Sequence, residues 1–165
     1  MFPSKKMMTM AAVFFGLAML IPVAQAQQPI DITDSVFAKI TVLSESKELT
    51  TMSSEVWGMV TSNNENKIFE NLTSHCVAVR KFVAGKQMKS LTYTKFMDSD
   101  GDILVTENLR TLDGPDATWN FLQGTGKWKG IKGGGKLRPA ARGKPITPGT
   151  LQGCIRMTGT FELPK

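Results

Sequence analysis

The 165-residue sequence has very little of the chemistry on which most enzyme sites depend. It contains one histidine, one tyrosine and two cysteines. A single imidazole excludes metal sites built from several histidines, and it leaves any nucleophile with one possible imidazole base. That histidine, His75, is adjacent to Cys76, but consecutive residues of a strand face opposite sides, so we do not expect them to act as a pair. We therefore predict no metal site and no cofactor, and we assign no catalytic residue.

Long apolar runs are also missing, because the run from Ala11 to Val23 has only 13 residues and crossing a bilayer as a helix takes about 20. Lys5 and Lys6 precede this run, and an A-x-A sequence ending at Ala26 follows it. This order is typical of a cleavable secretory signal peptide. We predict cleavage after Ala26, no stable membrane anchor, and a periplasmic or secreted protein. An uncleaved anchor is the alternative.

Acidic residues are absent from a long stretch near the C-terminal end of the chain. Residues 117–161 contain eight lysines and arginines and no acid, whereas residues 27–116 carry a net charge of −4. Removal of residues 1–26 leaves 139 residues with a net charge of +4. That length suits one domain, so we predict a single domain over residues 27–165.

Turn residues divide the remaining chain into short runs that favour β-strands. No segment shows a sustained helical repeat with caps. Near the C-terminus, Ile155, Met157 and Phe161 alternate with polar residues, which indicates one buried and one wet face. The near-regular spacing predicts an all-β fold, either a small antiparallel β-barrel or a sandwich. The predicted strands are Val36–Leu43, Glu55–Thr61, His75–Val83, Lys89–Met97, Ile103–Leu112, Thr118–Gln123 and Leu151–Leu163.

The most pronounced turn signal is the sequence DSDGD at residues 98–102. Asp and Gly tolerate the positive φ of tight hairpins, so we predict a connection between two antiparallel strands. A calcium loop is the alternative, because Asp98, Asp100 and Asp102 alternate like the first ligands of an EF-hand. The glycine then falls at the fourth position instead of the sixth, and Leu109 stands where a bidentate Glu is needed. We favour the plain turn.

The two cysteines, Cys76 and Cys154, predict a disulfide bond. An even number of cysteines in an exported chain favours pairing. Strand alternation places Cys76 on the face of Arg80 and Cys154 on the face of Arg156, so we expect both to point the same way from the sheet. A bond that closes a loop of 78 residues stabilises by up to about 4 kcal/mol in the chain-entropy model. Two free or buried thiols are the alternative.

The segment from Gly124 to Lys144 combines a glycine-rich start with seven basic residues. It lacks the glycine spacing of a phosphate-binding loop or a dinucleotide-binding turn, and it predicts a bulged β-hairpin with a long exposed loop. Its charge suggests a surface for an anionic ligand, with Trp128 as an aromatic platform. Alternatively, strand alternation turns Trp128 away from its basic neighbours and into the core. The candidate ligand-binding residues are Lys127, Trp128, Lys129, Lys132, Lys136 and Arg138.

Three segments, MDSDGDILVTENL, WNFLQGTGKWKGIKGGG and GCIRMTGTFELP, resemble a group of small exported bacterial proteins. That group is similar to the allene oxide cyclase barrel superfamily, whose calycin-like fold is an antiparallel barrel of about eight strands. The resemblance covers Glu55 to Pro164 and implies a fold, because function does not follow from fold alone. Plant allene oxide cyclases steer a cyclisation in a hydrophobic cavity, but none of their functional residues matches a position of this sequence.

Two functions of different class remain. The first is a non-catalytic exported barrel that binds a small hydrophobic, amphipathic or anionic ligand in its cavity or at the basic segment. The alternative is a cavity enzyme of the cyclase or isomerase type. Polar side chains on the inward strand faces favour the enzyme, and an aliphatic lumen favours binding or plain packing. We do not expect nucleic acid to be a partner.

Overall fold

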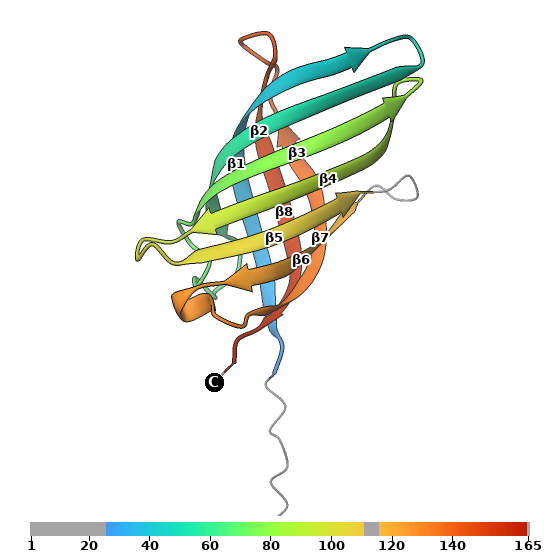
Figure 1. Cartoon of the computed structure of the whole chain (residues 1–165). Helices are drawn as coiled ribbons and strands as arrows, with labels where there is room; N and C mark the ends of the chain where they lie inside the picture. Colours follow the sequence, from blue (N-terminus) through green and yellow to red (C-terminus); the bar gives the residue numbers. More distant parts are fainter. Residues whose placement is uncertain (1–25, 111–115, 165) are drawn as a thin grey trace, which may run out of the picture.

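Alternating side chains build eight strands that close into a barrel (Figure 1). The computed structural model describes residues 26–110 and 116–164, and the predicted signal peptide lies outside this part except for its last residue. The strands are β1 (Gln28–Glu45), β2 (Leu49–Ser62), β3 (Thr73–Val83), β4 (Lys86–Met97), β5 (Ile103–Arg110), β6 (Ala117–Gly124), β7 (Lys132–Arg142) and β8 (Thr150–Glu162). A short 3₁₀ helix, η1 (Gly126–Trp128), lies between β6 and β7.

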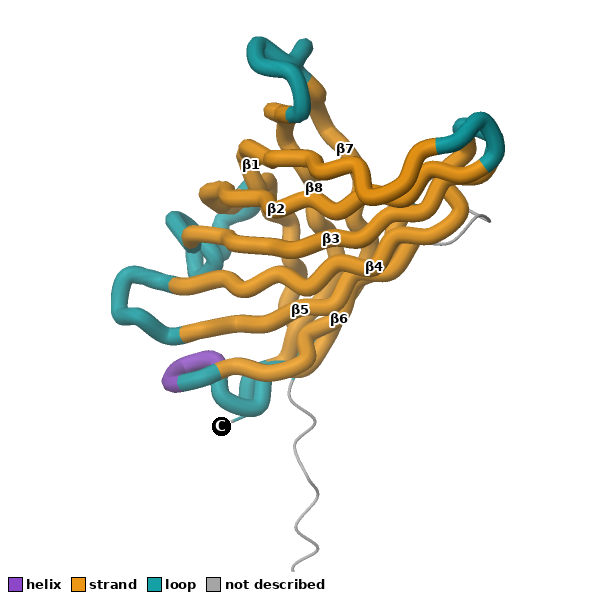
Figure 2. The backbone as a smooth tube through the Cα atoms, turned by 45° about the horizontal axis from the view of Figure 1, so that its top comes forward, coloured by secondary structure: helices purple, strands orange, loops and turns teal. Residues whose placement is uncertain are grey.

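Each strand pairs antiparallel with the next one in the chain, and β8 pairs back onto β1 to close the sheet. Ile32 of β1 lies opposite Ser62 of β2 on one side and Met157 of β8 on the other. Closure leaves no open sheet edge. The connections gather at the two ends of the barrel (Figure 2). The predictions of an all-β fold and of an eight-stranded barrel are confirmed.

The seven predicted strands all correspond to observed strands, and the largest difference is at the start of β1. This strand begins at Gln28, whereas the sequence pattern predicted a start at Val36. The early part was missed because Asp34 faces inward and is 6% exposed, which interrupts the apolar alternation that begins at Ile30.

One strand, β7, was not predicted. It lies in the basic segment, where the sequence pattern predicted a long exposed loop. β7 pairs with β6 and β8, and its glycines permit this pairing. A Cβ atom on Gly135 would lie 1.9 Å from the Thr158 carbonyl oxygen, and one on Gly134 would lie 2.3 Å from the Trp119 carbonyl oxygen. The glycines therefore allow close contact between the backbones of β6, β7 and β8, where the sequence pattern indicated a loop.

Aromatic side chains fill one end of the barrel and form a floor. Phe69, from the β2–β3 connection, stacks on Trp128 of η1 with 5.2 Å between ring centroids, and it meets Phe161 edge-on at 5.0 Å. Trp128 and Phe161 are fully buried, and Leu72 is 1% exposed. This packed floor closes one end of the lumen.

Among residues 26–110 and 116–164, no helix has the length and apolar character needed to cross a membrane.

Candidate functional site

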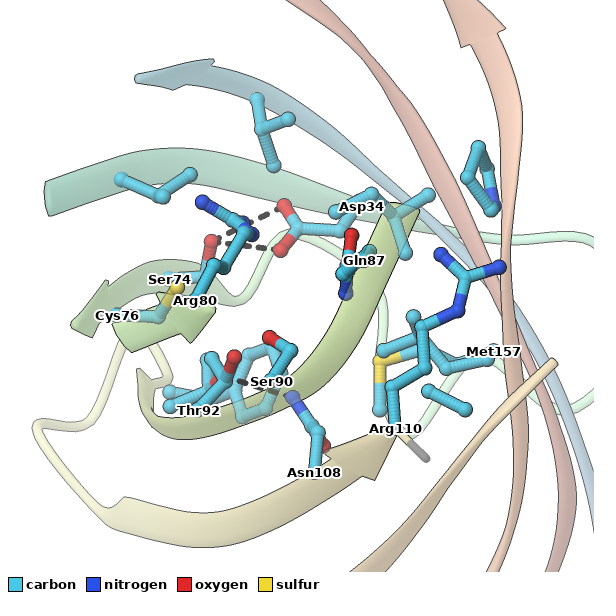
Figure 3. Close-up of a pocket in the computed structure, with 18 residues that line it drawn as sticks. Asp34, Ser74, Cys76, Arg80, Gln87, Ser90, Thr92, Asn108, Arg110 and Met157 are labelled. Carbon is cyan, nitrogen blue, oxygen red and sulfur yellow. Dashed lines mark hydrogen bonds between the residues drawn. The ribbon is translucent and has the colours of Figure 1, made fainter. Parts of the chain in front are cut away.

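Above the aromatic floor, the inward side chains leave an open lumen. It contains a lower cavity of about 160 Å³ and an upper cavity of about 290 Å³. Arg80 and Arg110 line both cavities, so the two cavities are adjacent. Figure 3 shows that Asp34 and Asn108, with these arginines, surround a common space although they come from β1, β3 and β5.

The wall of the lower cavity is polar on one side and apolar on the other. The polar side chains come from β3, β4 and β5: Ser74, Cys76, Arg80, Gln87, Ser90, Thr92, Thr94, Asn108 and Arg110. Most of the apolar side chains come from β1, β2, β7 and β8, and two more come from β4 and β6: Val36, Val56, Leu137, Pro139, Ile155 and Met157, with Phe96 and Ala117. Every second residue of a strand faces the lumen. The residue types at these alternate positions therefore decide which side of the wall is polar and which is apolar.

Asp34 brings a carboxyl group to the otherwise apolar side. Its two oxygens accept the Ser74 hydroxyl at 2.8 and 3.0 Å. Burial raises the pKa of Asp34, and the hydrogen bond from Ser74 offsets only part of this rise. Gly58 makes room for the group, because a Cβ atom there would lie 2.2 Å from Asp34 Oδ1.

Asn108 places an amide on the opposite side of the lumen. The residue is 8% exposed, and its Nδ2 donates to Thr94 Oγ1 at 3.4 Å. In the part of the chain that the structure describes, its Oδ1 accepts no hydrogen bond. A buried acceptor without a partner is uncommon in native proteins.

Three arginines line the upper cavity: Arg80, Arg110 and Arg142. Arg80 Nη1 donates to Ser54 Oγ at 2.6 Å. Burial lowers the pKa of Arg80, and the positive charge of Arg142 lowers it further. Within residues 26–110 and 116–164, no carboxylate lines this cavity. Arg80 and Arg142 therefore bring positive charge to the upper cavity.

Cys76 faces the same lumen as a thiol. Burial raises its pKa to about 11, so the group is protonated near neutral pH. The thiolate is the reactive form of cysteine. Cys76 thus contributes a small, inert side chain to the wall and does not provide a nucleophile.

The structure does not support the aromatic platform predicted on the basic segment. Trp128 is fully buried in the floor, where its Nε1 donates to Asp98 Oδ2 at 2.9 Å. Lys127 Nζ pairs with the same carboxylate at 2.9 Å. Trp128 belongs to the core, as the alternative interpretation expected. The remaining candidates, Lys129, Lys132, Lys136 and Arg138, are exposed, and none of the six lines the lumen cavities.

The DSDGD sequence connects β4 and β5, as predicted. Its carboxylates bind the protein's own donors: Asp98 accepts from Trp128 and Lys127, and Asp102 Oδ2 accepts the backbone N–H of Lys127 at 3.1 Å. In the described ranges, no group of three or more His, Cys, Asp or Glu is arranged to hold a metal ion. The structure gives the calcium alternative no support.

The predicted disulfide is wrong, because Cys76 and Cys154 are free thiols on opposite faces of the barrel wall. Cys76 lines the lower cavity, whereas Cys154 Sγ lies 3.8 Å from Ser35 Oγ, an exposed contact. The face comparison failed because Arg80 lines the lumen while Arg156 pairs with a carboxylate on the outer wall. In addition, β1 and β2 separate the two strands.

No family model matches the sequence, and no curated protein matches it. Among solved structures, the chain is similar to a pterocarpan synthase dirigent protein, with a TM-score of 0.50 and 11% sequence identity. The alignment covers 96% of this chain and 100% of that one. The likeness is one of fold. It agrees with the predicted barrel, and the more specific resemblance to the allene oxide cyclase superfamily stays a prediction.

The lumen residues were not among the candidates from the sequence. Asp34, Ser74, Arg80 and Asn108 each lie among β-forming neighbours and belong to no known motif. A signal was nevertheless present, since polar residues recur at every second position of β5 from Thr106 to Arg110. That spacing identifies a shared face, but it does not say whether the face is inside or outside.

Proposed function

We propose that this protein is a non-catalytic binding protein whose lumen holds one small amphipathic anion. The charged group of the ligand lies at the arginines of the upper cavity, and its apolar body lies along the aliphatic wall. One observation carries this proposal: Arg80 and Arg142 line a cavity whose described lining contains no carboxylate.

Electrostatics favours an anion at this position. Arg142 lowers the pKa of the buried Arg80, which means that the two cations oppose each other's charge. An anionic ligand relieves this repulsion. Guanidinium groups also form paired, charge-assisted hydrogen bonds to carboxylates, and such bonds are stronger where water is excluded.

The aliphatic wall supplies the rest of the affinity. Val36, Val56, Pro139 and Ile155 line both cavities. Transfer of apolar surface from water to such a wall is worth about 25 cal/mol per Å². An eight-stranded barrel has room for one small ligand, so we expect one molecule per chain.

Calorimetric titration with octanoate and octan-1-ol tests the proposal, because the two probes share a chain and differ in charge. We expect octanoate to bind more tightly. The variant Arg80→Met should weaken octanoate binding by about ten- to a hundredfold, which corresponds to about 1.5–3 kcal/mol for a hydrogen bond to a charged group, and should leave octan-1-ol binding nearly unchanged.

The matched control is Arg138→Met, which removes an exposed arginine that does not line the lumen cavities. It should leave the affinity for octanoate unchanged. Absence of octanoate binding, or an equal loss in the two arginine variants, contradicts lumen binding.

We also propose that the protein acts after export, in the periplasm or outside the cell. The support is the pattern of residues 1–26 together with the position of β1, whose first residue, Gln28, follows the expected cleavage site closely. N-terminal sequencing of the protein from a periplasmic or culture fraction should find Gln27 first. A chain that keeps Met1 there contradicts cleavage.

A second candidate function is a cavity enzyme of the cyclase or isomerase type. Two observations favour it. Polar side chains from β3, β4 and β5 line the lumen, which is the feature that the sequence analysis connected with an enzyme. The carboxyl of Asp34 is buried, and its raised pKa suits an acid–base group. The test uses the compound that co-purifies with the protein. If the parent converts this compound to an isomer while Asp34→Asn binds it unchanged, the protein is an enzyme. Equal recovery of unchanged compound from both supports binding alone.

A further inference from the structure

We infer that the open end of the barrel docks onto a lipid bilayer that carries anionic headgroups. The surface concerned, here called the rim, consists of three connections with the strand ends beside them: residues 42–49, 81–89 and 142–149. Docking depends on residues outside the lumen. The purpose that we assign to it, passage of an amphipathic anion between the bilayer and the lumen, rests on the proposed function.

The rim borders the place where the lumen reaches the surface. Figure 1 shows the β1–β2, β3–β4 and β7–β8 connections at the end of the barrel opposite the C-terminus and η1. Ala141 and Arg142, at this end of β7, are exposed and also line the upper cavity. A bilayer in contact with the rim therefore faces the opening of the lumen.

Large apolar side chains of the rim face solvent. β1 pairs with β8 only as far as Lys39, whereas its pairing with β2 continues to Glu45, so the β1–β2 hairpin projects beyond β8. On this projection Leu43 is 62% exposed, and Ile146 in the β7–β8 connection is 86% exposed. The other exposed large apolar residues of the rim are Val42, Leu49 and Val83. Such a group at one end of a molecule marks an interaction surface, whereas a single exposed apolar residue does not.

Positive charge accompanies these apolar side chains. The rim carries six basic and two acidic residues. The connections at the floor end, residues 63–72, 98–102 and 125–131, carry three basic and five acidic residues. Anionic headgroups attract lysines and arginines that come within about one Debye length of the bilayer surface. The charge therefore turns the rim toward an anionic bilayer and the floor away from it, and the apolar side chains then enter the interface.

The outer wall of the barrel fits this partner less well. It also exposes apolar side chains, among them Val77 and Tyr93. In the strand pairing, however, Val77 lies opposite Glu55 and Tyr93 lies opposite Glu107. Contact through this area would bring both carboxylates against the anionic headgroups, so the rim is the surface that we assign to the bilayer.

Vesicle flotation tests the inference with protein purified from a periplasmic or culture fraction. The probes are vesicles of phosphatidylcholine alone and vesicles of phosphatidylcholine and phosphatidylglycerol in equal amounts. We expect the protein to bind the mixed vesicles and to bind the neutral ones at least about tenfold more weakly, because each basic residue near the surface contributes to the attraction. High salt should remove most of this difference, since it screens the charges.

The variants Leu43→Ser and Ile146→Ser should each weaken binding to the mixed vesicles by about tenfold, because each removes an apolar side chain that enters the interface. The matched control is Leu122→Ser, which changes an exposed apolar residue near the floor end of β6 and should bind as the parent does. None of the three residues lines the lumen cavities, so all three variants should keep the affinity for octanoate.

The variant Lys144→Glu tests the contribution of charge. Reversal of this exposed rim charge should weaken binding to the mixed vesicles by at least about tenfold and should leave binding to neutral vesicles unchanged. The control, Lys129→Glu, makes the same change in net charge at the floor end, where Lys129 is exposed, and should have little effect. Equal losses in the two variants contradict the orientation with the rim toward the bilayer.

The outcomes separate docking from the proposed function. If the parent does not bind the mixed vesicles, or if Leu122→Ser costs as much as the two rim variants, docking at the rim is wrong, whatever octanoate does. If vesicles bind and octanoate does not, the rim docks, but the proposed function fails and the passage of its ligand fails with it. Sedimentation without vesicles should give the parent and Ile146→Ser the same mass. A dimer that Ile146→Ser dissociates would assign the rim to a second copy of the chain and overturn the inference.

Discussion

Asp34 is a carboxyl group on the inward face of β1, where its neighbours Ile32 and Val36 are apolar and buried. Burial raises its pKa, so its charged form costs folding free energy. In contrast, Asp31 faces outward and forms an ion pair with Arg156, and hydrogen bonding to that arginine lowers the pKa of Asp31. The two carboxyl groups, three residues apart, therefore affect stability with opposite sign.

The variant Asp34→Asn should be more stable than the parent at pH 7. A raised folded-state pKa means that the folded protein holds a proton that the unfolded chain releases, so the parent loses stability as pH rises above the unfolded value of 3.8. The advantage of the variant should shrink as pH falls toward that value. Urea unfolding at pH 4 and pH 7 measures the difference.

Asp31→Asn is the control of opposite sign. A lowered folded-state pKa stabilises the parent above the unfolded value of 3.8, and this contribution is lost as pH falls through the folded-state value. Asp31→Asn should therefore be less stable than the parent at pH 7, with a deficit that persists at pH 4. Equal behaviour of the two variants would show that the lumen does not desolvate Asp34.

Among the elements, β7 shows most clearly what a sequence pattern can and cannot predict. Its run of glycines, followed by Pro139, has the composition of a loop, yet the strand pairs with both neighbours. The strands with regular alternation, such as β8, were predictable because one face is wet. β7 was not, since its glycines serve close contact with Thr158 and Trp119, and such contacts depend on the closed barrel.

Gly135→Ala should destabilise the protein by about 1–3 kcal/mol, the usual cost of overpacking. The new Cβ atom would lie 1.9 Å from the Thr158 carbonyl oxygen and 2.6 Å from the Gly159 Cα atom, both of which belong to backbone. Gly143→Ala is the control, because its Cβ atom would make an ordinary contact of 3.5 Å. Thermal unfolding of the two variants should separate them, and equal midpoints would contradict the close pairing of β7.

In the whole molecule, closure of the barrel determines which face of each strand lies inside and which lies outside. The sequence pattern could not show this, and the wrong prediction of a disulfide follows from it. Alternation showed that Cys76 and Arg80 share a face, and it did so correctly. Which face was the lumen depended on closure, and Cys154 fell on the other one. The polar lining of the lumen was not predicted either, because alternation does not show which face of a strand is inside.

Because both cysteines are free, the midpoint of thermal unfolding should be the same with and without a reductant. Unfolded, unreduced protein should take up two alkyl groups, which intact mass measures. A mass that shows no alkylation before reduction and two groups after it would reinstate the disulfide and contradict the placement of Cys76 inside the barrel.

The packed floor formed by Phe69, Trp128 and Phe161 gives the lumen a measurable depth. A straight-chain acid that enters from the arginine end can add methylene groups only until its tail touches these rings. Affinity should therefore climb by up to about fourfold for each methylene, the equivalent of about 0.8 kcal/mol, and then level off at one chain length. The barrel would in this way discriminate among straight-chain acids by their chain length.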